Sequence, residues 1–194
     1  MARWPRRTSD LEPTAQQSAL ALAGAAALGL VAGLVAAAGK RGAHSAANAL
    51  TGDWLDVLKA EQLTLADMFE RLDRSKPGQP RRRLALLARI RHALERYAFE
   101  EESVVYPVLR RSEPVLAAEL TENHAGFKAA VDELEQSDPD ENAWLMRARA
   151  LAERIESHAR REEMDVFPPF RAQLSAREDR RLTQRLFKAG RRLA

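Results

Sequence analysis

Two stretches of this chain place a carboxylate four residues after a side chain that can ligate a metal. His158 and Glu162 have this spacing in SHARREEMDVFPP, and Tyr97 and Glu101 have it in RYAFEEESVVYPV, earlier in the chain. Positions four apart on an α-helix lie about 40° apart around its axis, so both side chains of a pair reach the same spot. The repeat indicates a duplicated site in which one copy has changed, because Tyr97 of the first copy aligns with His158 of the second.

The duplication includes one further residue upstream of each pair. His124 precedes His158 at nearly the same spacing at which Gln62 precedes Tyr97. Imidazole and carboxylate groups suit divalent iron or manganese and leave open positions for water or a small ligand. The phenol of Tyr97 has two interpretations, a ligand to ferric iron or a ring that fills space. Gln62 offers only a neutral amide and is a degenerate ligand position.

Each of these polar residues interrupts an apolar stripe with helical spacing. The stripes predict helices over about 54–72 and 81–106, a third that starts near 112–114, and a fourth that starts at Asp138–Pro139. Burying an unpaired carboxylate in a core is unfavourable, so Glu101 and Glu162 are expected to be paired or bound to metal. For a single histidine, a hydrogen-bonded place in the core is the simpler interpretation, but two histidines in register favour ligation.

Short connections between the four helices favour an all-α, up-down-up-down antiparallel four-helix bundle. Asp53 is a candidate N-cap of the first helix, and RSKPGQP predicts the first turn. A fifth helix is expected after Ser175, because Ser175-Ala-Arg-Glu178 has the capping-box pattern. The expected segments are a basic tail (1–17), an apolar helix (18–39), a linker (40–52), the bundle (53–172) and a basic C-terminal helix (173–194).

The combined motifs resemble the hemerythrin HHE cation-binding domain over residues 53 to about 172. They are KAEQLTLADMF, YAFEEESVVYP, TENHAGF and HARREEMDVFP, with a proline ten residues after Tyr97 and after His158. The resemblance implies a four-helix bundle around a non-haem di-iron centre, in which each iron takes histidines from one hairpin and two glutamates bridge. The Ala/Gly-rich segment that precedes the domain is similar to that of alphaproteobacterial hemerythrin-domain proteins.

Carried over to this chain, the resemblance makes His124 and His158 ligands of one iron, with Glu101 and Glu162 at the bridging positions. Gln62 and Tyr97 stand where the histidines of the other iron belong. The expected centre is therefore incomplete, with about one iron or manganese per chain. Glu102 and Glu163 are expected on a solvated face or behind the ligands, and His92 in solvent; His44, in the linker, carries no indication.

An apolar run near the N-terminus predicts a membrane anchor. Residues 19–39 contain no charged or strongly polar side chain, and a run of this length suffices for a helix that crosses a bilayer. Small residues recur at every fourth position, which would let two such helices approach closely in a homodimer: Ala21, Ala25, Gly29, Gly33 and Ala37. We expect a single-pass protein of a bacterial inner membrane with undecided orientation. The alternatives are a signal sequence or a soluble Ala-rich helix, the latter with a cytoplasmic location.

The composition excludes several classes of site. The chain has no cysteine, which rules out disulfides, thiolate zinc sites and cysteine nucleophiles. The net charge of +3 is concentrated in residues 175–194, which hold seven Lys/Arg and two acids. The main domain is therefore not basic, and no nucleic-acid partner is expected. The basic terminal helix is expected to be solvated, or to touch anionic lipid if it lies near a membrane.

The leading functional hypothesis is a membrane-anchored hemerythrin-like protein that binds or senses iron, oxygen, nitric oxide or peroxide. No dedicated reaction is expected, because no substrate pocket can be recognised in the sequence. The alternative is a metal-free pseudo-domain that serves as a membrane-tethered interaction module. An oxidoreductase acting on peroxide or nitric oxide is a third and weaker hypothesis.

Overall fold

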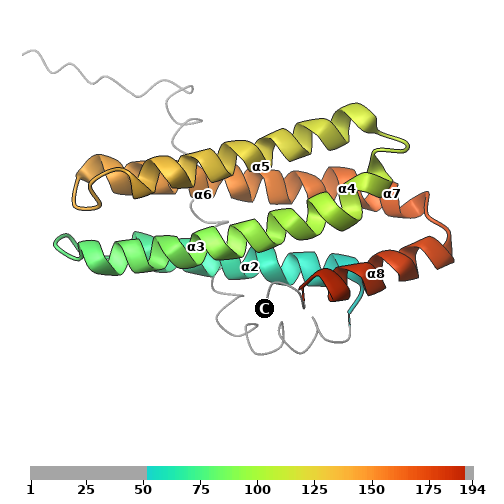
Figure 1. Ribbon diagram of the computed structural model, residues 1–194, viewed down its shortest axis with the longest axis horizontal. Helices are drawn as coiled ribbons and strands as arrows, with labels where there is room; N and C mark the ends of the chain where they lie inside the picture. The colour runs from blue at the N-terminus through green and yellow to red at the C-terminus, as the bar shows by residue number, and fades with distance from the viewer. Residues whose placement is uncertain (1–51, 191–194) are drawn as a thin grey trace, which may run out of the picture. The chain divides into compact units, whose positions relative to one another are not determined.

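The computed structural model describes residues 52–190, which form helices and turns without a strand (Figure 1). Helix labels follow Figure 1 and begin at α2. The elements in chain order are α2 (Trp54–Asp73), α3 (Pro80–Glu100), η1 (Glu101–Val105), α4 (Tyr106–Leu109), α5 (Pro114–Glu135), α6 (Asn142–Arg161), η2 (Glu162–Val166), α7 (Phe167–Ala172) and α8 (Ala176–Gly190).

Four long helical rods form the bundle that the sequence predicted. The first is α2, the second runs through α3, η1 and α4, the third is α5, and the fourth runs through α6, η2 and α7. Helix α2 packs against α3 and α6, and α5 packs against the same two helices (Figure 1). The rods therefore surround one shared core, into which all four can direct side chains.

Local capping explains where the first and last helices begin. The Asp53 carboxylate accepts hydrogen bonds from the backbone N–H groups of Leu55 and Asp56, and the Asp56 carboxylate accepts one from Asp53 N–H. Ser175 and Glu178 exchange the same pair of bonds at the start of α8. These reciprocal bonds satisfy N–H groups that have no partner within the helix. Both sequence-predicted caps are confirmed.

The prediction that the fourth helix starts at Asp138–Pro139 is wrong, because α6 begins at Asn142. The Asp138 carboxylate accepts a hydrogen bond from Asp140 N–H at 2.9 Å and so holds a turn, the arrangement that competes with an N-cap. The carbonyl of Pro139 accepts a hydrogen bond from the buried Arg83 guanidinium on α3. This tertiary contact keeps the residues before Asn142 out of the helix.

The predicted second helix, 81–106, is also not a uniform α-helix. It begins at Pro80 and widens into the π-helical segment η1, where Tyr106 N–H donates to the carbonyl of Glu101. The fourth rod has the same feature in η2, where Phe167 N–H donates to Glu162. A proline follows each segment, and a proline lacks the N–H of a regular turn and clashes with the carbonyl four residues earlier. Both motif glutamates thus stand at the first residue of a widened turn, a frequent feature of functional sites.

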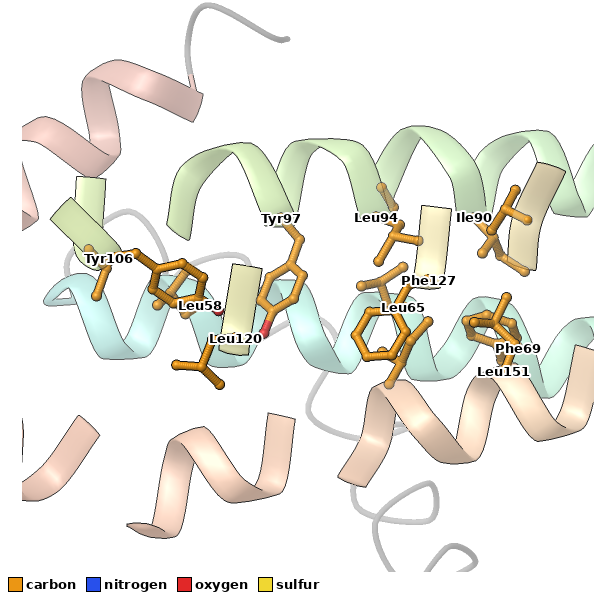
Figure 2. Packing of buried hydrophobic residues seen from close by; sticks show 14 of the residues in the cluster. Leu58, Leu65, Phe69, Ile90, Leu94, Tyr97, Tyr106, Leu120, Phe127 and Leu151 are labelled. Carbon is orange, nitrogen blue, oxygen red and sulfur yellow. The ribbon is translucent and has the colours of Figure 1, made fainter. Parts of the chain in front are cut away.

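The core continues from the bundle to α8. Leu58, Leu65, Phe69 and Ile90 lie among the buried apolar side chains (Figure 2). At the end near α8, the Trp54 ring meets Phe167 edge-on at 5.3 Å between centroids, and its indole N–H donates to the Asp179 carboxylate at 2.8 Å. Three α8 side chains are buried against the bundle: Leu182, Leu186 and Ala189. The predicted fifth helix is therefore part of the packed core.

The expected membrane helix (18–39), its row of small residues and His44 lie outside the described residues. None of the helices within residues 52–190 combines the length and the apolar character needed to cross a bilayer.

Candidate metal centre

Four buried side chains from four elements converge in the middle of the bundle. They are His124 on α5, His158 on α6, Glu101 at the start of η1 and Glu162 at the start of η2, each at most 5% exposed. The two Nε2 atoms of the histidines are 3.0 Å apart. Glu101 Oε2 lies 3.2 Å from His124 Nε2, and Glu162 Oε2 lies 3.3 Å from His158 Nε2. The four predicted ligands therefore lie in one buried cluster, within which Glu162 contacts His158 and is outside the group formed by Glu101, His124 and His158.

A fifth residue at this point, Tyr106, was missed by the sequence reasoning. Its hydroxyl hydrogen-bonds to Glu162 Oε1 at 2.6 Å and to Glu101 Oε2 at 3.1 Å, and it lies 3.3 Å from His124 Nε2. In the sequence, Tyr106 has the context of an ordinary core aromatic residue, since it directly precedes a proline. Its counterpart in the repeat is Phe167. That difference, a phenol in one copy and a plain ring in the other, was the available signal.

Tyr97 also reaches the centre, whereas Gln62 touches it only through Tyr97. The Tyr97 hydroxyl donates to Glu162 Oε2 at 2.6 Å, and Gln62 Nε2 donates to the Tyr97 oxygen at 3.3 Å. In Figure 2 the rings of Tyr97 and Tyr106 approach the same region from opposite sides. Gln62 is only half-buried, and its Oε1 is without a hydrogen-bond partner among the described residues. The first hairpin thus brings a phenol and a remote amide where the second brings two imidazoles.

The two glutamates have opposite pKa shifts. Burial raises the pKa of Glu101 well above its ordinary value, and the nearby charge of Glu162 raises it further. Burial also acts on Glu162, but hydrogen bonds from His158, Tyr106 and Tyr97 outweigh it and lower that pKa. In the cluster by itself, ionisation is therefore less favourable for Glu101 than for Glu162. A bound cation would let both ionise, because it supplies the missing positive charge.

Outside the centre, Glu102 lies behind the His124 ring. Its Oε1 is 3.0 Å from His124 Nδ1 and accepts a hydrogen bond from Lys128 Nζ at 3.1 Å. Burial alone would raise the pKa of Glu102, but the bonds from His124 and Lys128 bring it below its ordinary value. Glu102 and Glu163 were each expected either on a solvated face or behind the ligands. Glu102 lies behind a ligand, His124.

The remaining sequence-predicted positions lie apart from the cluster. Glu163 is half-buried and makes no recorded side-chain hydrogen bond within residues 52–190. His92 is exposed, as expected. A surface hollow between α3, η1 and α8 is lined by residues that do not belong to the cluster: Phe99, Ser103, Val104, Arg185, Lys188 and Ala189.

The donor set fits a divalent transition-metal ion. One donor atom each from Glu101, His124 and His158 can be chosen so that all lie within 4.8 Å of one another. Ligand atoms about 2.1 Å from an ion and at right angles lie about 3.0 Å apart, close to the spacings in the cluster. Glu101 Oε1 is buried without a hydrogen-bond partner in the described part of the chain, as a free donor atom would be. Two imidazoles with two carboxylates are a set that iron and manganese accept.

Comparison with known proteins agrees with this geometry. The sequence profile named Hemerythrin HHE cation binding domain matches residues 54–170. The chain belongs to this family. A crystal structure of a hemerythrin HHE cation binding domain-containing protein from Mycobacterium kansasii has the same fold, with a TM-score of 0.64 and 17% sequence identity. The match covers 73% of this chain and 87% of the mycobacterial one. No curated protein matches the chain.

Proposed function

We propose that this HHE-family protein binds about one non-haem iron ion per chain through His124, His158, Glu101 and Glu162, with manganese as the competing metal. The observation that carries the proposal is the convergence of two imidazole nitrogens and two carboxylate oxygens, with neighbouring atoms 3.0 to 3.3 Å apart. The first hairpin supplies no imidazole to the centre, which argues against a second ion of equal affinity.

An iron ion in this centre would supply an open coordination position for a small ligand such as oxygen, nitric oxide or peroxide. The protein's own contribution is to hold and enclose the ligands. The Tyr97 and Tyr106 phenols each donate to one oxygen of Glu162, which fixes that carboxylate. The burial of all four ligands favours binding or sensing of a very small molecule over turnover of a larger substrate.

Metal content of the purified protein tests the proposal. Wild type, His124→Ala and His158→Ala would be compared by elemental analysis after expression in iron- and manganese-supplemented medium. His92→Ala is the matched control, because His92 is an exposed histidine on α3. We expect about one metal per chain in wild type and in His92→Ala, and far less in the other two variants. Equal metal content in all four proteins would refute the assigned ligands.

One observation favours a second candidate, a metal-free pseudo-domain that acts as an interaction module. The hydrogen bonds from Tyr97, Tyr106 and His158 already satisfy Glu162, so the cluster is partly saturated without a cation. Under this alternative the wild-type protein would carry no more iron or manganese than His158→Ala does.

We further propose that residues 18–39 anchor the protein in a bacterial inner membrane, where the small-residue row would support a homodimer. The support is the charge-free length of residues 19–39. Five exposed cations on α8 would then be available to anionic lipid, because none forms an ion pair within residues 52–190: Arg177, Arg180, Arg181, Arg185 and Lys188. Full-length protein should remain with membranes after an alkaline, high-salt wash, and a variant starting at Gly52 should not. Recovery of the full-length protein in the supernatant would refute the anchor.

A further inference from the structure

The two hairpins differ in what lies behind their first ligand position. In the second hairpin, the Nδ1 atom of His124 faces Glu102 at 3.0 Å. Glu102 belongs to the first hairpin and directly follows the motif residue Glu101. One hairpin therefore supplies the ligand and the other supplies the carboxylate behind it.

The repeat assigns a counterpart to each member of this contact. When the two copies are aligned so that Glu162 falls on Glu101, Glu163 falls on Glu102. The counterpart of His124 is Gln62, since each precedes the first motif residue of its own hairpin at nearly the same spacing. Glu163 follows Glu162 in η2, as Glu102 follows Glu101 in η1.

The packing of the bundle repeats the same relation. Segment η1 continues α3, and α3 packs against α5, which carries His124. Segment η2 continues α6, and α6 packs against α2, which carries Gln62. If the two hairpins are equivalent in this respect, Glu163 faces α2 as Glu102 faces α5. It is half-buried, and the Gln62 side chain turns its amide nitrogen to Tyr97 instead.

We propose that Glu102 is the positioning residue of His124. Glu163 is then the equivalent residue for position 62, but it has no imidazole to orient because residue 62 of this chain is glutamine. The Glu102 carboxylate accepts the Nδ1–H of His124, which fixes the ring and leaves Nε2 as the atom that faces the centre. A histidine that ligates a metal through Nε2 needs this tautomer, and a hydrogen-bonded carboxylate enforces it. The proposal rests on the proposed metal site, but its first two measurements need no metal.

The first measurement reads the His124 tautomer in metal-free protein. Side-chain ¹⁵N shifts of histidine-labelled protein distinguish Nδ1–H from Nε2–H. We expect His124 to be Nδ1-protonated in wild type, to become a mixture of tautomers in Glu102→Ala, and to be largely restored in Glu102→Gln, which keeps an acceptor oxygen. Glu163→Ala is the matched control and should leave the His124 signals unchanged. An identical tautomer in wild type and Glu102→Ala would overturn the role of Glu102.

The second measurement tests the pairing of Glu163 with position 62 by introducing a histidine there, Gln62→His, again in metal-free protein. We expect the introduced imidazole to be Nδ1-protonated when Glu163 is present and to lose that preference when Glu163→Ala is added. Gln62→His with Tyr97→His serves as a second background if the single variant packs poorly beside Tyr97. An introduced imidazole whose tautomer ignores Glu163 in the folded variants would overturn the pairing of Glu163 with position 62.

The third measurement uses Fe²⁺ and Mn²⁺ with a competing chelator under anaerobic conditions. Loss of a carboxylate behind a ligating histidine weakens metal binding by roughly 10- to 100-fold. We expect that loss in Glu102→Ala and less than about a twofold change in Glu163→Ala. Equal effects of the two substitutions on metal affinity would overturn the proposed difference in role between Glu102 and Glu163. If wild type binds neither ion, the proposed function fails, and the tautomer measurements alone then decide the roles of Glu102 and Glu163.

Discussion

At the scale of single residues, the stability of the centre depends on how its buried carboxyl groups are hydrogen-bonded. Glu101 and Glu162 both lie fully out of solvent, and Tyr97 and Tyr106 donate to Glu162. Burial, followed by the charges of Glu101 and Glu162, raises the pKa of both phenols well above the ordinary value, so they remain donors at neutral pH. Each polar group in the cluster depends on its neighbours, so single substitutions should have effects beyond the atoms that they remove.

His158→Ala should remove the metal-dependent part of stability. Metal bound only to the folded state stabilises it by about 2.7 kcal/mol at a free concentration of 100 times Kd. Thermal unfolding with and without added Fe²⁺ measures this increment. We expect a clear rise in melting temperature for wild type and for the exposed control His92→Ala, but none for His158→Ala. A metal-dependent rise that persists in His158→Ala would exclude His158 as a ligand.

Tyr97→Phe should destabilise the protein through the hydrogen bonds of its hydroxyl. The change leaves Glu162 Oε2 without a phenol donor and Gln62 Nε2 without its acceptor, at a cost of about 1–3 kcal/mol in the free energy of unfolding. Urea unfolding measures the loss. Tyr106→Phe is the comparison, because it also removes a donor to Glu162. A visible phenolate-to-iron band in the ferric protein that only Tyr97→Phe abolishes would instead make Tyr97 a ligand.

At the scale of elements, the two π-helical segments and α8 shape the surroundings of the centre. Segments η1 and η2 widen the helix at the motif glutamates before each rod continues into α4 or α7. Helix α8 covers α2, α3 and η1 on one side of the bundle. Beneath its last residue, Gly190, lies the buried side chain of Glu100, and a Cβ at Gly190 would come within 2.9 Å of Glu100 Oε1.

Glu100→Gln should therefore make the protein more resistant to mildly alkaline pH. Burial, followed by the charge of Glu61, raises the pKa of Glu100 from 4.5 to about 8. Between these values the unfolded chain releases the Glu100 proton while the folded chain keeps it, so stability falls as pH rises from about 4.5 to 8. The glutamine side chain of Glu100→Gln does not titrate in this range, so this loss of stability should be absent from the variant.

Unfolding free energies at pH 5 and pH 8.5 measure this effect. We expect Glu100→Gln to match wild type at pH 5 and to exceed it at pH 8.5. The control is Glu122→Gln, which replaces an exposed glutamate on α5 and should follow wild type at both values. A wild-type-like loss of stability between the two pH values in Glu100→Gln would show that another group is responsible.

At the scale of the whole molecule, the bundle is two similar hairpins that contribute unequally to one centre. The glutamates of both hairpins are in place, whereas the imidazoles come from one hairpin alone. Gln62→His combined with Tyr97→His should therefore raise the metal content from about one to about two per chain. The small cavity left by the lost Tyr97 ring should cost about 1 kcal/mol.

Elemental analysis measures the second ion, and the oxidised double variant should gain the near-ultraviolet absorption of an oxygen-bridged iron pair. Each single variant should bind less, because one imidazole with two shared carboxylates holds iron poorly. A folded double variant that still binds one ion or none would mean that the first hairpin does not reach the centre as the second does.

The sequence by itself determined the helical rods, the caps at Asp53 and Ser175, and the four side chains that meet in the core. Periodicity and the repeat carry that information, because helical spacing decides which residues share a face. The sequence also indicated the asymmetry, since Gln62 and Tyr97 differ in type from His124 and His158. These properties depend on residue type and spacing along the chain alone.

Only the tertiary structure decided the start of α6, the place of Tyr106 and the contact between Glu102 and His124. Arg83 from α3 binds the Pro139 carbonyl and so competes with local helix formation, which no local pattern reports. Tyr106 reaches the centre because a widened turn precedes Pro107. Glu102 meets His124 across two hairpins. Contacts between distant segments depend on how rods pack, and helical spacing within one rod does not contain that information.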